Sequence, residues 1–342
     1  MKIRFNIVAI SLYVLPALIY LYLTNLSKIR FYESSFFAIQ VSLFFTFFGF
    51  LLGIFLSKKI KFKLIDFSSK KYFFIINILL SVAILSIFFQ LLKHGIPLLN
   101  NSLRADIQQG ILWNIFTFSS MLSLFLSSYV YFVLKEKLNF FIKLMIFVLF
   151  ILTVLTGWKS TLLNYIFIFS SFFILYSEIN ISILLKAFFS FLVIFFGINA
   201  LRSGIYSISF EELFNYFFYG FENFVRIAPV YTAECLHSVP LLNSNCQFVY
   251  DNNSLINPTF NVYTALMPIY ADGGAILVGF VFFMFSFILG LMKDYKNSFF
   301  IAFLFYLSHY FFMMAHNGYV FNSGSFVLML FLLFVYDFIR IR

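Results

Sequence analysis

The sequence predicts an all-α polytopic membrane protein with about ten transmembrane helices and one large loop late in the chain. Hydrophobic residues occupy 63% of its 342 positions and charged residues only 11%. A soluble domain carries about 25% charged residues and has no means of burying so much apolar surface. The mean hydropathy of +0.98 points the same way. Soluble, disordered and collagen-like chains are therefore excluded.

Ten apolar stretches approach the length of about 20 residues that a helix needs to cross a bilayer. They divide the chain into a seven-span region over 1–201, a large loop over 202–272 and a three-span region over 273–342. The predicted spans are 5–24, 36–57, 72–92, 111–134, 140–156, 161–177, 181–201, 273–292, 298–314 and 325–339.

The distribution of lysine and arginine predicts the orientation of these spans, because cytoplasmic loops of membrane proteins are enriched in both. With both termini inside, 16 of the 23 basic residues are cytoplasmic. The net charge of +10 is spread over short loops rather than over one face, which argues against a nucleic-acid partner. The seven basic residues on the outer face are Lys28, Arg30, Lys93, Arg104, Lys159, Arg202 and Arg226.

The large loop over 202–272 lies on the outer face and contains a predicted amphipathic helix over 210–226. Ser209 and Glu212 form a capping box at its start. Either this helix lies on the bilayer surface, or its polar stripe faces a substrate cavity. The stripe follows a helical spacing and consists of Asn215, Tyr219, Glu222 and Arg226.

Outer cations at the ends of apolar spans are candidate ligands for a phosphate group. Arg104, Arg202 and Arg226 are predicted on the outer face, although basic residues are generally enriched on the cytoplasmic side. The guanidinium group suits bidentate phosphate binding. The alternative is snorkelling, in which the charged head group reaches lipid phosphates. Lys159 lies beside Trp158 and fits an interfacial belt better, although it stays among the candidates.

Acidic and histidine side chains supply the candidate bases, and no soluble-type catalytic motif accompanies them. Glu222, His316 and Asp272 are candidates in falling order, although Asp272 also suits a helix N-cap before Gly273. The chain contains no Walker motif, no GxSxG elbow and no HExxH motif. We find no metal-ligand cluster in the sequence and expect neither a metal nor a cofactor.

Three segments resemble the O-antigen polymerases of the Wzy type, which polymerise oligosaccharide repeat units. The first, Gly95-Ile96-Pro97-Leu98-Leu99 before Arg104 and Gly110, is similar to the first outer loop of that family. The second is Thr156-Gly157-Trp158-Lys159-Ser160, in which Lys159 replaces the usual arginine. The third, Asn261-Val262-Tyr263-Thr264 with Tyr270-Ala271-Asp272-Gly273-Gly274, is similar to the stretch that closes the family's large periplasmic loop.

The resemblance implies a metal-independent membrane glycosyltransferase at the periplasmic face of the bacterial inner membrane. Its substrate would be an oligosaccharide on undecaprenyl diphosphate, held among membrane lipids. Cations would stabilise the departing diphosphate and a base would help deprotonate the attacking hydroxyl. Tyr219, Asn215 and Tyr263 are then the candidates for glycan contacts. A chain-length regulator and a flippase of the same pathway are expected partners.

A ligase-like transferase and a flippase are the two alternative functions. A ligase-like transferase would use the same donor with a different acceptor, whereas a flippase should place charges inside its spans. Here lysine and arginine avoid the span centres, which favours a transferase.

Cys235 and Cys246 both lie in the large loop, and a periplasmic location predicts a disulfide between them rather than two buried thiols.

Overall fold

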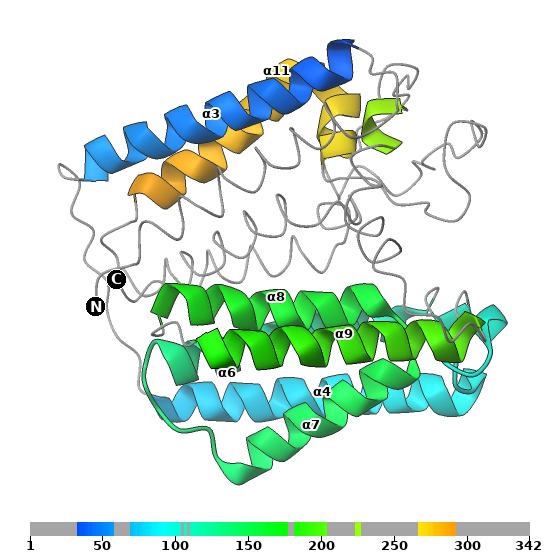
Figure 1. Cartoon of the computed structure of the whole chain (residues 1–342). Coiled ribbons are helices and arrows are strands. Elements are labelled where there is room, and N and C mark those ends of the chain that lie inside the picture. The colour runs from blue at the N-terminus through cyan, green and yellow to red at the C-terminus, as the bar shows by residue number, and fades with distance from the viewer. Residues whose placement is uncertain are drawn as a thin grey trace. The chain divides into compact units, whose positions relative to one another are not determined.

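The structure, a computed structural model, consists of helices joined by turns and loops in the part of the chain that it describes. It describes residues 33–57, 69–103, 106–107, 110–176, 181–203, 223–226 and 266–291 (Figure 1). The elements are α3 Glu33–Ser57, α4 Ser69–His94, the 3-10 turn η2 Asn101–Leu103, α6 Ile111–Phe132, α7 Phe140–Leu155, α8 Lys159–Tyr176, α9 Ile181–Ser203 and α11 Leu266–Leu291.

Each of these α-helices coincides with a predicted span, so the all-α class is confirmed for the described residues. The spans predicted over 5–24, 298–314 and 325–339 lie outside them, and the number of ten stays a prediction. The largest boundary difference concerns the span predicted to begin at 273, because α11 begins seven residues earlier at Leu266.

Three described helices are both long enough and apolar enough to cross a membrane: Phe36–Ser57, Tyr72–His94 and Ile111–Phe132. The first two carry many exposed phenylalanine and leucine side chains; Phe44 is 63% exposed and Phe74 is 68% exposed. Lipid tails are the natural surroundings of such side chains. The protein is therefore a helical membrane protein.

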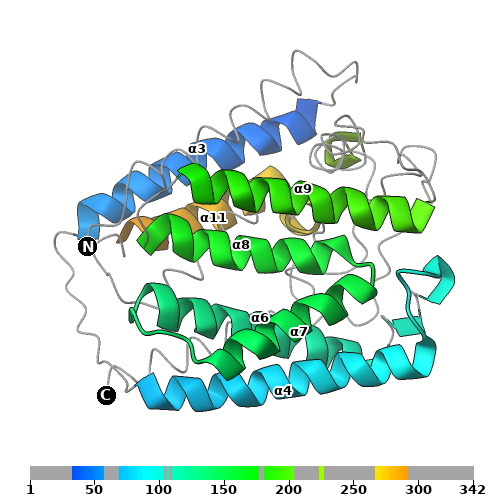
Figure 2. The ribbon, with the colours of Figure 1, turned by 60° about the horizontal axis from the view of Figure 1, so that its bottom comes forward.

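The chain forms two compact units, which we describe separately. One unit comprises residues 65–209, and the other comprises residues 1–64 together with 210–342. In the first unit α6 contacts both α4 and α8, and α7 contacts α4 and α8. In Figure 2, α6 and α7 are seen between α4 and α8.

Aromatic and hydroxyl side chains hold the bundle of residues 65–209 together. Tyr72 of α4 contacts Tyr129 of α6 at 5.6 Å between ring centroids, and Phe125 of α6 meets Phe172 of α8 at 4.8 Å. Five buried serines of α6 also face the interior: Ser119, Ser120, Ser123, Ser127 and Ser128. Small polar residues of this kind let helices approach closely in a membrane.

Three of the buried serines of α6, namely Ser120, Ser123 and Ser127, donate their hydroxyls to carbonyl oxygens of their own helix. Ser123 donates to the carbonyl oxygen of Ser120 at 2.8 Å, and Ser127 donates to that of Ser123 at 2.7 Å. This local pairing removes the cost of burying a hydroxyl without a partner. The serines therefore serve close packing.

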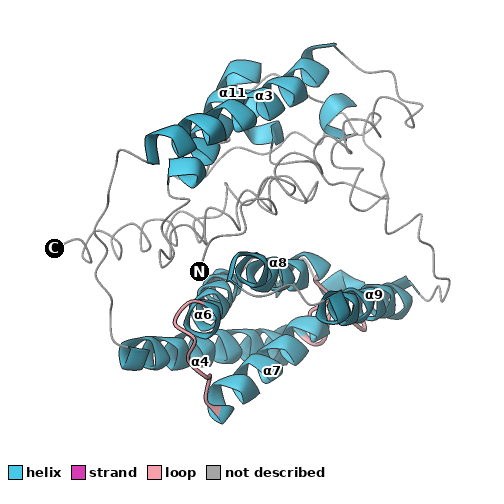
Figure 3. Ribbon diagram, turned by 60° about the vertical axis from the view of Figure 1, so that its left-hand side comes forward, coloured by secondary structure: helices cyan, strands magenta, loops and turns pink. Residues whose placement is uncertain are grey.

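In the other unit α3 and α11 pack along each other (Figure 3). Glycines make this contact close: a Cβ on Gly49 would lie 2.5 Å from the carbonyl oxygen of Phe283. A Cβ on Gly53 would overlap the carbonyl oxygen of Phe287, and one on Gly290 would overlap that of Phe50. Backbone therefore meets backbone at three places, as in other membrane helix pairs with small residues at the contact.

Candidate functional site

Two of the three segments that resemble the polymerase family lie together at one end of the 65–209 bundle. The backbone N–H of Leu98 donates to the carbonyl oxygen of Leu155, the last residue of α7, at 3.0 Å. Leu98 is 6% exposed and belongs to a buried cluster with Leu162, Tyr165 and Ile198. The loop after α4 is therefore fastened to the turn between α7 and α8.

Backbone geometry explains the sharp turns in both segments. Gly95 ends α4 with φ +88°, and Gly157 separates α7 from α8 with φ +68°, values that side chains other than glycine rarely adopt. Thr156, fully buried, donates its hydroxyl to the carbonyl oxygen of Thr153 at 2.6 Å. Its Oγ1 also accepts the backbone N–H of Trp158 at 3.3 Å, which holds the turn before Lys159.

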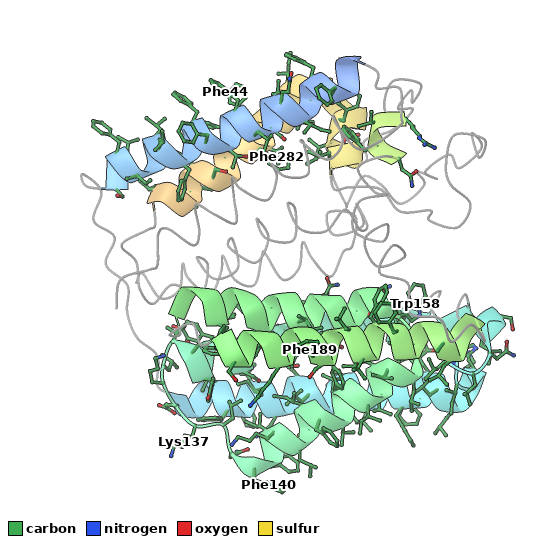
Figure 4. All side chains as sticks on the ribbon, viewed as in Figure 1. Phe44, Lys137, Phe140, Trp158, Phe189 and Phe282 are labelled. Carbon is green, nitrogen blue, oxygen red and sulfur yellow. The ribbon has the colours of Figure 1, made fainter. Side chains whose placement is uncertain are left out.

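The start of α6 lies at the same end of the bundle. Trp113 in the first turn of α6 contacts Trp158 with ring centroids 5.7 Å apart. Figure 4 shows Trp158 at one end of the bundle and Lys137 at the opposite end. Lys137 precedes α7 and Trp158 follows it, so α7 runs from one end of the bundle towards the other.

The buried side-chain amide of Gln90 lies next to the N-cap residue of α6. Gly110 is that N-cap, and no side chain caps the helix there. Gln90 of α4 is 3% exposed, and its Oε1 has no hydrogen-bond partner within the described part of the chain. A Cβ built on Gly110 would lie 2.6 Å from Nε2 of Gln90.

In the other unit, the helical segment 223–226 packs against the first part of α11. Asn223, Phe224 and Val225 are almost fully buried, and Arg226 is half-buried. Phe224 meets Tyr270 edge-on, with ring centroids 5.6 Å apart and planes at 88°. The described end of the predicted amphipathic helix is thus in contact with protein.

α11 is broken immediately after Asp272. Gly273 has φ −156° and ψ 22°, and Gly274 has φ +61° and ψ −159°, so the helix is interrupted and then continues to Leu291. Asp272 is half-buried and lies inside the helix rather than at its start. Asp272 is therefore not the N-cap at the start of α11, as the sequence predicted. It is the residue immediately before the break in this helix.

The structure describes only some of the predicted site residues. Lys159 begins α8, and Arg202 belongs to the last turn of α9. Arg226 and Asp272 come from contacting elements of one unit, whereas Lys159 and Arg202 belong to the other. Outside the described residues lie Arg104, Asn215, Tyr219, Glu222, Cys235, Cys246, Tyr263 and His316.

Comparison with known families assigns the chain. A family model described as O-antigen polymerase matches residues 9–219, which is more than half of the sequence. The chain belongs to the O-antigen polymerase family. Neither the curated proteins nor the solved structures contain a significant match.

Membership of the O-antigen polymerase family confirms the resemblance drawn from the motifs and implies a glycosyltransferase-type activity in a membrane protein. The matched region includes both contacting segments of the 65–209 bundle, namely the loop after α4 and the turn before α8. Sequence reasoning did not single out Gln90, although a lone amide near the end of an apolar span was the available signal.

Proposed function

We propose that the protein polymerises oligosaccharide repeat units carried on undecaprenyl diphosphate into O-antigen or a related surface polysaccharide. The reaction takes place at the periplasmic face of the bacterial inner membrane. The observation that supports this best is the contact between the loop after α4 and the turn before α8 at the end of the bundle opposite Lys137. Family membership supplies the reaction class.

The proposed reaction is a glycosyl transfer between two lipid-linked molecules. A hydroxyl at the non-reducing end of a new repeat unit attacks the anomeric carbon of the growing chain. The bond from that carbon to the diphosphate oxygen breaks, and undecaprenyl diphosphate leaves with the bonding electrons. A sugar diphosphate is already a good leaving group, so cationic side chains are sufficient to stabilise it and we propose a metal-independent reaction.

Polar and charged residues of the outer segments divide into three roles under this proposal. Glu222, His316 and Asp272 are the candidate bases for the attacking hydroxyl, while Asn215, Tyr219 and Tyr263 are the candidate glycan contacts. The diphosphate would be bound by Arg104, Arg202 and Arg226, with Lys159 in support. Burial of 223–226 against Tyr270 supports a place for Arg226 beside Asp272, because these elements touch.

Deletion of the gene, followed by electrophoresis of the surface polysaccharide, tests the proposed function. The deletion should replace the ladder of polymer lengths by a single repeat unit on the lipid core, and the wild-type gene should restore the ladder. Complete loss of repeat units from the core would instead indicate a ligase or a flippase. An unchanged ladder would refute all three activities.

A further inference from the structure

We propose that the start of α7 forms a binding site for an anionic phospholipid, whose phosphate is bound by Lys137 and Lys143. The site lies at the end of the 65–209 bundle opposite Trp158 (Figure 4), and its test does not depend on the proposed function. Lys143 is a charged residue in the first turn of an otherwise apolar helix. A cation at such a position is costly unless it reaches lipid headgroups or an opposite charge.

The surface of α7 divides into a side that packs against protein and a side that is exposed. The buried residues recur at a helical spacing: Ile142, Met145, Leu149 and Thr153. Exposed apolar residues recur on the opposite side: Phe140, Leu144, Phe147 and Ile151. Lys143 is exposed and lies one turn from both Phe140, which is 80% exposed, and Phe147. In a membrane this lysine is therefore surrounded by lipid.

The ammonium groups of both lysines can reach the level of the residue that caps α7. Side chains on a helix point towards its N-terminus, and the stem of a lysine can lie along apolar neighbours while its charge reaches polar surroundings. From Lys143 this direction leads to the N-cap residue Asn139, whose carbonyl oxygen accepts the backbone N–H of Lys143 at 3.2 Å. Lys137 is exposed and precedes Asn139 by two residues. Two cations are thus available at one level of the bundle.

The balance of charge at this place favours a headgroup that is negative overall. Residues 133–155 contain three lysines and a single carboxylate, that of Glu136, which is half-buried. Among the described residues no carboxylate pairs with Lys137 or Lys143. The phosphate of any phospholipid could accept from these lysines, but the cation of a zwitterionic headgroup would be repelled by them. An anionic phospholipid brings the phosphate without that cation.

Exposed aromatic side chains beside the lysines complete the site. Tyr131, close to the end of α6, is exposed, and tyrosine concentrates where the hydrocarbon of a bilayer meets the headgroups. Phe140 and Phe141 are exposed at the start of α7 and offer apolar surface to acyl chains. Figure 4 shows Phe140 at the same end of the bundle as Lys137. One phospholipid can therefore place its phosphate at the lysines and its chains along the exposed side of α7.

Titration with defined phospholipids tests the site in the purified full-length protein, held in an uncharged detergent. The thermal midpoint of the wild type should rise with phosphatidylglycerol and should rise less with phosphatidylcholine, because a ligand of the folded state stabilises it. Lys137→Gln and Lys143→Gln should each weaken phosphatidylglycerol binding about 5-fold, and the double variant about 25-fold, the loss expected for lysines near an anionic lipid. Both side chains are exposed, so these variants should fold.

Lys143→Arg and Lys93→Gln are the matched controls. Lys143→Arg keeps the positive charge on a long side chain, so it should bind phosphatidylglycerol like the wild type. Lys93→Gln removes an exposed lysine from the last turn of α4, at the other end of the bundle, and should leave binding unchanged. A loss in Lys143→Arg as large as that in Lys143→Gln would show that the charge does not bind the lipid, and would overturn the site.

Three further outcomes would also overturn the site. They are equal binding of phosphatidylglycerol by the double variant and the wild type, an equal loss in Lys93→Gln, and equal binding of phosphatidylglycerol and phosphatidylcholine by the wild type. Inorganic phosphate at the concentration of the lipid phosphate should leave the thermal midpoint unchanged. If inorganic phosphate raised the midpoint as much as phosphatidylglycerol does, the ligand would be a soluble anion and the assignment of a lipid would be wrong.

Discussion

At the scale of single residues, the chemistry of arginine decides what the outer cations do. Arg104, Arg202 and Arg226 come from separate segments, and a shared diphosphate would require each guanidinium to make paired hydrogen bonds. Lysine offers a point charge without the planar fork of arginine. A diphosphate clamp should therefore be lost even when the charge is kept, whereas a lipid anchor should not.

We expect each Arg→Lys change at these three positions to reduce polymerisation by roughly 100- to 1000-fold. This corresponds to about 2.7–4 kcal/mol, the typical effect of removing one group that stabilises transition-state charge. The measurement is the length of the polysaccharide ladder, with the amount of protein in the membrane checked for each variant. Arg30→Lys is the control, because Arg30 is also predicted on the outer face but belongs to no clamp. Normal ladders in all three variants would make these residues anchors.

A second prediction at this scale concerns Cys235 and Cys246. Both belong to the large loop, and an oxidising periplasm would keep them paired. Closing a loop of this size stabilises the folded state by about 3 kcal/mol. Alkylation before and after reduction measures the pairing, and we expect both thiols to react only after reduction. Reaction of both in the unreduced protein would show them to be free.

At the scale of the helices, the break in α11 depends on one backbone conformation. Gly274 has φ +61° and ψ −159°, a region that is almost restricted to glycine, and a Cβ there would meet no atom within 4 Å. The cost of a side chain at Gly274 therefore comes only from strain in the backbone. We expect Gly274→Ala to destabilise the protein by about 1–3 kcal/mol.

Gly197 provides the matched control for the break in α11. It lies within α9, and a Cβ at this position would also meet no atom within 4 Å. Alanine is favoured over glycine by about 1 kcal/mol inside a helix, so Gly197→Ala should be neutral or stabilising. Thermal unfolding in detergent compares the two variants. If Gly274→Ala were as stable as Gly197→Ala, the break would not require the observed conformation.

At the scale of the whole molecule, the orientation in the membrane follows from the basic loops. Reporter fusions after residues 65 and 295 should report the cytoplasm, and a fusion near residue 245 should report the outside. This outcome is expected because it places 16 of the 23 basic residues inside. An outside signal at 295 would contradict the predicted number of crossings.

Fusions at Lys137 and Trp158 extend the test to the bundle. These residues lie at opposite ends of the 65–209 unit, so a crossing by α7 requires opposite signals. α7 has only 16 residues, a short length for a span. The same signal from both fusions would show that α7 does not cross the bilayer.

The sequence alone was sufficient for the helical class, the positions of the described helices and the family resemblance. Apolar runs of membrane length leave the backbone few alternatives to a helix, because every N–H and C=O must be paired within the segment. The glycines that end α4 and α7 took on this role only in the structure, where Gly95 and Gly157 have positive φ. The motifs of the loop after α4 and the turn before α8 could thus be read before any fold was known.

Tertiary structure decided which of these segments meet. The hydrogen bond from the backbone N–H of Leu98 to the carbonyl oxygen of Leu155 joins segments more than 50 residues apart. No local sequence pattern specifies such a contact. The same is true of Phe224 against Tyr270 and of the buried amide of Gln90 next to Gly110. In a chain where nearly every helix is apolar all round, the sequence does not mark which face meets protein and which meets lipid. That choice is made by packing between helices, where small residues and rings fit together.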